Sequence, residues 1–166
     1  MGVIKDLGAQ VIQLDERTYS VKGGLNPTTE TINTGESGLA TRLFTPIASL
    51  CDRAITVTGR GSMLNRPIGM MMKPLQNLGV EVHSDGFLPI SVKGPIKGGE
   101  TDVDGYVSSQ FITGLLTALP MAKNDTTLHI DHANSTPYIA MTIDAVGKFG
   151  IRIEHNDYRE FFVPAG

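Results

Sequence analysis

The hydrophobic positions along the chain follow two periods, one typical of helices and one typical of strands. Residues 109–122, SQFITGLLTALPMA, are apolar around nearly the whole helical circumference, which predicts a helix that is buried on most sides. Residues 54–59, AITVTG, and 126–131, TTLHID, instead suit short strands bounded by turn residues. The succession of both kinds of segment predicts an α+β fold.

Extended to the whole chain, the pattern predicts strand, helix, strand, helix, strand, strand in two successive segments. The predicted strands are residues 30–33, 55–58, 80–84, 88–92, 101–104, 126–130, 151–155 and 160–163. The predicted helices are residues 38–50, 67–78, 108–119 and 136–148. Pro67 suits the first position of its helix, where its missing N–H costs nothing, whereas Pro74 predicts a kink inside the same helix.

Three stretches show that the chain is internally repeated: IKDLGAQVIQLD, LQNLGVEVHSD and VGKFGIRIEHND. Their glycines are Gly8, Gly79 and Gly150, and the spacings are 79−8 = 71 and 150−79 = 71. Each stretch is typical of a helix that ends at a glycine and is followed by a strand. We therefore expect a single domain over residues 1–166, with repeated units at about 29–93 and 100–163. Residues 1–22 match only the tail of a unit, which favours a fragment of a longer protein.

Composition and charge narrow the function classes. The 166 residues are 40% hydrophobic and carry a net charge of −3 without a basic run, which argues against a nucleic-acid partner. No segment approaches the roughly 18 apolar residues of a membrane span. The single cysteine, Cys51, forms no internal disulfide, and the N-terminus does not resemble a signal peptide, so we expect a cytoplasmic protein.

Four polar stretches at predicted strand-to-helix junctions are candidates for chemistry. They are residues 35–42 (GESGLATR), 59–69 (GRGSMLNRPIG), 104–111 (DGYVSSQF) and 132–141 (HANSTPYIAM). Each has a structural interpretation as a helix cap or a solvated loop, with Ser37 as a cap and Glu36 near the helix dipole as one example. Each also has a functional interpretation, because free N–H groups at helix starts, together with Arg42 and Arg66, bind anions.

The repeat relates these junctions in pairs, so helix starts from both units are expected to face one small polyanion. Other chemistries find little support. The four histidines show no metal-ligand spacing, no Walker A or GxGxxG motif is present, and Cys51 lies in an apolar helix end. We therefore expect no metal and no cofactor.

The motifs SGLATR, RPIG, DGYVSSQF with LLTALP, and STPYIAMT resemble those of 5-enolpyruvylshikimate-3-phosphate synthases, over almost the entire chain. The resemblance implies βαβαββ units of the enolpyruvyl transferase type (an inverse α/β barrel), with two full units and the end of a third from the N-terminal of two domains. It implies transfer of the enolpyruvyl group of phosphoenolpyruvate to the 5-hydroxyl of shikimate 3-phosphate. The alternatives are a UDP-N-acetylglucosamine 1-carboxyvinyltransferase and a non-catalytic anion-binding module.

The resemblance also implies the ligand-binding residues. Shikimate 3-phosphate is expected on Ser108, Ser109, Gln110, Ser135 and Tyr138. Phosphoenolpyruvate is expected on Gly38, Arg66, Gln110 and, less directly, Arg42. No catalytic residue is expected in this chain, since the acid–base groups and the Lys-Ser phosphate clamp of the family find no match here. The missing C-terminal domain of the same polypeptide is thus an expected partner, and the isolated chain is expected to show no turnover.

Three residues depart from the usual Gly-Asn-Ala-Gly-Thr turn of the family and the proline that often follows it. Glu36 replaces the asparagine, Leu39 the threonine, and Leu43 stands where the proline is common. A carboxylate at Glu36 would repel an anion unless it turns away or pairs with Arg42. The shape of this subsite and its response to inhibitors are therefore left open.

Overall fold

The computed structural model describes residues 2–105 and 109–166. The first complete unit forms a four-stranded sheet of order β3-β4-β6-β5, in which β3 and β4 are parallel and the other pairs antiparallel. Its elements in chain order are β3 (Thr31–Asn33), α2 (Gly38–Ala48), β4 (Ile55–Thr58), the 3-10 helices η1 (Gly61–Asn65) and η2 (Gly69–Met71), α3 (Met72–Asn77), β5 (Glu81–His83) and β6 (Ile90–Lys93).

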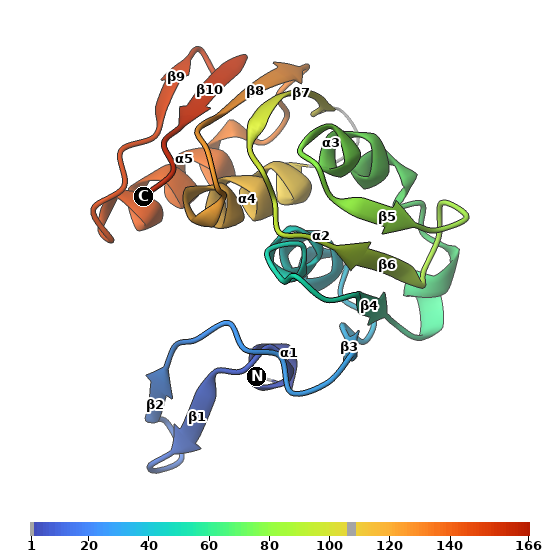
Figure 1. Cartoon of the computed structure of the whole chain (residues 1–166). Coiled ribbons are helices and arrows are strands. Elements are labelled where there is room, and N and C mark those ends of the chain that lie inside the picture. Colours follow the sequence, from blue (N-terminus) through green and yellow to red (C-terminus); the bar gives the residue numbers. More distant parts are fainter. Residues whose placement is uncertain (1, 106–108) are drawn as a thin grey trace.

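The second unit repeats this arrangement. Its sheet has the order β7-β8-β10-β9, again with a parallel first pair and antiparallel pairs beyond it (Figure 1). Its elements are β7 (Gly99–Asp104), α4 (Ser109–Ala118), the 3-10 helix η3 (Leu119–Met121), β8 (Thr126–Asp131), α5 (Thr136–Gly147), β9 (Glu154–Asn156) and β10 (Glu160–Val163). The two sheets thus share one strand order.

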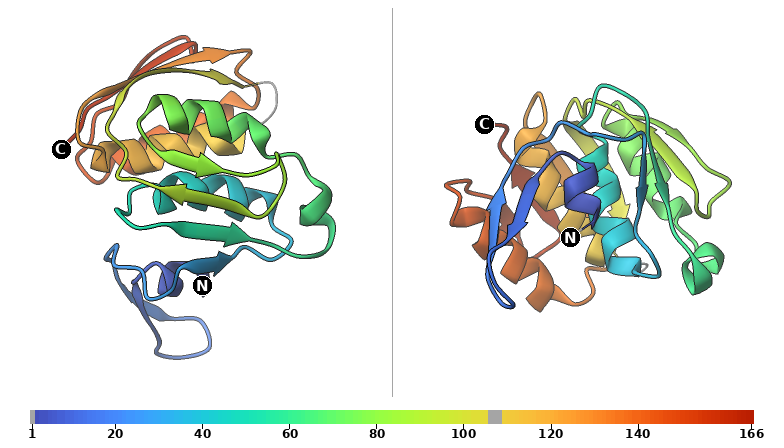
Figure 2. Two further views of the ribbon diagram at one scale, coloured as in Figure 1. Left: turned by 45° about the vertical axis from the view of Figure 1, so that its right-hand side comes forward. Right: turned by 90° about the horizontal axis from the view of Figure 1, so that it is seen from below.

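The N-terminal segment forms α1 (Gly2–Asp6) and an antiparallel hairpin of β1 (Gln10–Gln13) and β2 (Tyr19–Lys22). Figures 1 and 2 show this hairpin standing apart from both four-stranded sheets. Leu7, which follows α1, is buried in the common core, whereas Tyr19 and Val21 of the hairpin are exposed. The order α1-β1-β2 is the same as that at the end of each complete unit, where α3 is followed by β5 and β6 and α5 by β9 and β10.

Helices α2 and α4 approach each other closely because residue 114 is a glycine. A Cβ atom on Gly114 would lie 2.6 Å from the carbonyl oxygen of Arg42 and 3.0 Å from Cα of Leu43. Pro46 inside α2 has no N–H to donate to the Arg42 carbonyl one turn earlier. This contact brings the first turns of α2 and α4 alongside each other, and the two turns carry Gly38 and Gln110.

Two predicted elements are placed differently in the structure. The predicted helix 67–78 starts later, since Pro67 and Ile68 lie outside it, Ile68 N–H donates to Gly86 O at 2.8 Å, and residues 69–71 form the 3-10 helix η2. Helix α3 begins at Met72, directly after η2, so Pro74 falls in its first turn, where no N–H is needed, rather than inside a longer α-helix. The predicted strand 151–155 begins only at Glu154 and extends to Asn156; before it, Arg152 is exposed and Ile153 is buried.

Candidate functional site

The first part of the site is the start of α2. Ser37 is the N-cap residue, and its hydroxyl accepts the Ala40 N–H at 3.1 Å, as expected from the sequence. The N–H groups of Gly38 and Leu39 in the same turn precede the intrahelical ladder and are suited to an anion. The capping and anion-binding interpretations of this turn are therefore compatible.

A buried guanidinium lies behind this turn. Arg42 is 9% exposed and donates to Gly38 O at 3.3 Å and to Pro67 O at 3.4 Å. Its Nε finds no partner among the described residues. Burial, with a further contribution from Arg66, holds the pKa of Arg42 below its usual range. Two neighbouring guanidinium groups without a carboxylate partner in the described part of the chain create a site that favours an anion.

Three polar side chains from three elements meet at Gly38. A Cβ atom on Gly38 would lie 2.8 Å from Nη1 of Arg42, 3.2 Å from Nη1 of Arg66 and 3.8 Å from Oε1 of Gln110. Gly38 is buried at this position. Any side chain here would occupy the space into which both guanidinium groups and the amide point.

The second part of the site comes from the other unit. Ser109 and Gln110 open α4, and Ser135 and Tyr138 lie at the start of α5; all four line one cavity of about 940 Å³. Ser135 adopts a left-handed conformation at the N-cap of α5, and its hydroxyl makes no capping bond. Tyr138 is 64% exposed, so it does not serve as a core residue. Ser108 lies outside the described residues.

Gln110 joins the two parts, since it lines the cavity and also faces Gly38. The structure therefore brings together every predicted site residue that it describes. All four junctions contribute to the first cluster or to the cavity, through Gly38, Arg66, Gln110 and Ser135. The ligand roles of these residues remain predictions.

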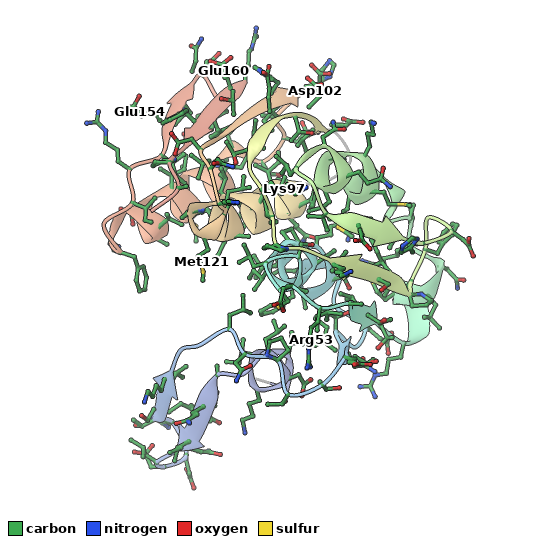
Figure 3. All side chains as sticks on the ribbon, viewed as in Figure 1. Arg53, Lys97, Asp102, Met121, Glu154 and Glu160 are labelled. Atoms are coloured by element: carbon green, nitrogen blue, oxygen red, sulfur yellow. The ribbon has the colours of Figure 1, made fainter. Side chains whose placement is uncertain are left out.

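The sequence interpretation missed the apolar wall of the cavity. This wall is made of side chains from α2, η3, α5 and the segment after α5, among them Leu39, Leu43, Met121, Met141 and Phe149. Phe149 is 89% exposed, and Figure 3 shows Met121, the last residue of η3, projecting on the side where the hairpin lies. The available signal was the set of apolar residues within 139–151, for which the sequence predicted a helix and a strand but no exposed apolar surface.

The carboxylate of Glu36 is turned away from the guanidinium pair. Its Oε2 accepts the N–H of Ser62 at 3.4 Å, and no ion pair joins it to Arg42 within the described residues. The sequence left open whether Glu36 turns away from the anion site or pairs with Arg42. In the structure it turns away. The pair of guanidinium groups stays available to a ligand.

Fold and site together define a class of protein: an α+β scaffold of repeated units whose helix starts, with two arginines, meet at one site. A sequence model of the family described as EPSP synthase (3-phosphoshikimate 1-carboxyvinyltransferase) matches residues 1–165, and the chain belongs to this family.

Individual relatives agree with this assignment. The chain is 40% identical over 136 residues to the 3-phosphoshikimate 1-carboxyvinyltransferase of Clostridium novyi, covering 81% of the chain and 31% of the relative. It is 38% identical over 159 residues to the enzyme of the same name from Methanocorpusculum labreanum, covering 93% of the chain and 38% of the relative. The chain thus spans well under half the length of these relatives.

Among solved structures, EPSP synthase from Acinetobacter baumannii has a similar fold, with a TM-score of 0.79 at 23% identity. The match covers 99% of this chain and 38% of that protein, and it supports the predicted fold class. Within the described residues, no helix is both long and apolar enough to cross a membrane.

Proposed function

We propose that the protein to which this chain belongs transfers the enolpyruvyl group of phosphoenolpyruvate to the 5-hydroxyl of shikimate 3-phosphate and releases phosphate. This reaction would serve the shikimate pathway to aromatic amino acids, in the cytoplasm. The observation that carries the proposal is the convergence of Arg42, Arg66 and Gln110 on Gly38, next to the cavity of the second unit. Family membership supplies the reaction class.

The proposed subsites follow the two parts of the site. Ser109 and Ser135 hold the 3-phosphate of shikimate 3-phosphate, together with Ser108, while Gln110 and Tyr138 contact its ring. In support, the hydroxyl of Ser135 is not used for capping and that of Ser109 lines the same cavity. Phosphoenolpyruvate binds at the start of α2, against the backbone of Gly38 and the guanidinium groups of Arg66 and Arg42.

The chemistry divides between this chain and the rest of the protein. Transfer requires a proton for the enol carbon of phosphoenolpyruvate and stabilisation of the tetrahedral adduct that forms when the 5-hydroxyl attacks. The residues of this chain bind and orient both substrates and neutralise their charge. Acid–base groups are expected from the remaining polypeptide, so the chain alone binds substrate weakly and has no turnover.

We further propose that the chain belongs to the N-terminal domain of a two-domain enzyme, and that the remaining polypeptide covers its exposed apolar surfaces. The cavity wall around Phe149 and the exposed hairpin residues Tyr19 and Val21 support this, because contiguous apolar surface usually marks an interface. The matching family model favours this reaction over transfer to UDP-N-acetylglucosamine.

A calorimetric titration of the chain with shikimate 3-phosphate tests the proposal, with Ser109→Ala as the paired variant. We expect measurable heat for the wild-type chain and an affinity at least about tenfold lower for the variant, because a charge-assisted hydrogen bond is lost. Equal affinity in both proteins would exclude the assigned phosphate subsite. An assay of the full-length gene product then distinguishes an enzyme from a non-catalytic binding module.

A further inference from the structure

The turn before α2 and the loop before η1 are in direct contact. Arg60 N–H donates to Gly35 O at 2.9 Å, and Ser62 N–H donates to the carboxylate of Glu36 at 3.4 Å. Between these two bonds, Gly61 has a left-handed φ of 56° and lies against the Glu36 carboxylate. A Cβ atom on Gly61 would be only 2.5 Å from Glu36 Oε2, so a side chain at this position would displace the carboxylate.

The same two segments continue directly into the anion site. The turn leads from Glu36 into α2, which begins at Gly38, and the loop leads from Ser62 through η1 to Arg66. The Arg66 N–H is fixed by a bond to Met63 O at 3.2 Å. Nη1 of Arg66 lies 3.2 Å from the position that a Cβ atom on Gly38 would take. The two segments therefore touch at two places, at Glu36 with Ser62 and at Gly38 with Arg66.

We infer that Glu36 is a positioning residue for Arg66: its carboxylate holds the loop of residues 59–66 against the turn before α2 and so fixes where the Arg66 guanidinium faces Gly38. This inference rests on the proposed function only for the identity of the ligand. Arg66 is exposed, and the described residues offer it no ion pair. Its place at the site therefore depends on the loop that carries it.

Glu36 has two opposing effects on an anion at this site. Its charge weakens anion binding through space, while its hydrogen bond strengthens binding through Arg66. Glu36→Gln removes the charge and keeps an oxygen acceptor, whereas Glu36→Ala removes both. The difference between the two variants therefore isolates the positioning effect from the charge.

The first measurement requires no ligand. Amide hydrogen exchange of the 166-residue chain is compared among the wild type, Glu36→Gln and Glu36→Ala, with attention to Ser62 and Arg66. We expect Glu36→Ala to speed exchange at both amides about 3- to 10-fold, as for the loss of one hydrogen bond, and Glu36→Gln to stay near the wild type. Equal exchange at both amides in all three proteins would overturn the inference.

The second measurement adds phosphoenolpyruvate and, separately, shikimate 3-phosphate. Glu36→Ala is expected to bind phosphoenolpyruvate about 3- to 10-fold more weakly than Glu36→Gln, with shikimate 3-phosphate affinity unchanged. In an Arg66→Ala background, where positioning through Arg66 cannot act, Glu36→Ala and Glu36→Gln should bind phosphoenolpyruvate equally, because both lack the charge. A persisting difference there, or an equal loss for both ligands, would contradict positioning through Arg66. If the exchange result holds but the wild type does not bind phosphoenolpyruvate, the proposed ligand is wrong and the positioning role stands.

Discussion

At the scale of single residues, Arg42 is expected to lower the stability of the fold while it strengthens anion binding. Its guanidinium is buried with two long hydrogen bonds to carbonyl groups and an unpaired Nε. We expect Arg42→Met to keep or raise the melting temperature, because an unpaired buried charge is removed while the apolar stem is retained. The same variant should bind phosphoenolpyruvate at least about tenfold more weakly, since a charge-assisted contact is lost.

Arg66→Met is the matched control for this prediction, since Arg66 is exposed. It should lose binding to a similar degree without any change in melting temperature. Thermal denaturation and calorimetry of both variants provide the two quantities. A large destabilisation by Arg42→Met with intact binding would show that Arg42 is a structural residue.

Cys51 provides a pH-dependent test at the same scale. The thiol is 6% exposed, and burial raises its pKa above the ordinary value of 9.0. Because the folded state holds the proton more tightly, this contribution to stability is present below pH 9.0 and is lost as the pH rises further. Native chain should therefore react with a disulfide reagent roughly a hundredfold more slowly than unfolded chain. In Cys51→Ala this alkaline loss of stability should be absent; an equally fast native reaction would contradict burial.

At the scale of elements, the spacing of α2 and α4 decides whether the site is assembled. Gly114→Val should destabilise the chain by about 1–3 kcal/mol, as overpacking does, because its side chain meets the backbone of Arg42 and Leu43. It should also weaken shikimate 3-phosphate binding, since α4 carries Gln110 away from Gly38. Chemical denaturation and calorimetry measure the two effects.

Gly147→Ala is the control for this helix substitution. Gly147 is also a helical residue, at the end of α5, and nothing lies within 4 Å of a Cβ atom there. We expect it to be neutral or slightly stabilising, because alanine restricts the unfolded chain. If Gly114→Val were equally harmless, close packing of α2 on α4 would not be required.

Also at this scale, most elements could be predicted from hydrophobic periodicity, since strands such as β4 and β10 alternate and α4 is apolar on most sides. The late start of the helix predicted over 67–78 could not be foreseen from periodicity. It depends on a long-range hydrogen bond from the Ile68 N–H to the Gly86 carbonyl. The sequence identified the four junctions through their glycines, serines and arginines. It could not show that Gln110 faces Gly38 or that Glu36 faces Ser62, because both contacts depend on how distant segments pack.

At the scale of the whole molecule, the apolar cavity wall predicts how the isolated chain behaves. Phe149, Met141 and Met121 are all at least 65% exposed. We expect the chain to bind a hydrophobic fluorescent dye and to self-associate as its concentration rises. Phe149→Ser should reduce both effects, whereas Phe87→Ser, outside this cavity, should not. Sedimentation that shows a monomer at all concentrations, together with no dye binding, would contradict the proposed covering of this surface.

We propose that junctions from the two repeated units form one binding site. The most direct test is an NMR titration of the chain with shikimate 3-phosphate and phosphoenolpyruvate together, following the amides of Gly38, Gln110 and Thr136. We expect the three signals to shift along one common saturation curve, because one pair of ligands contacts both units. Shifts confined to a single unit, or separate curves for the two units, would contradict it.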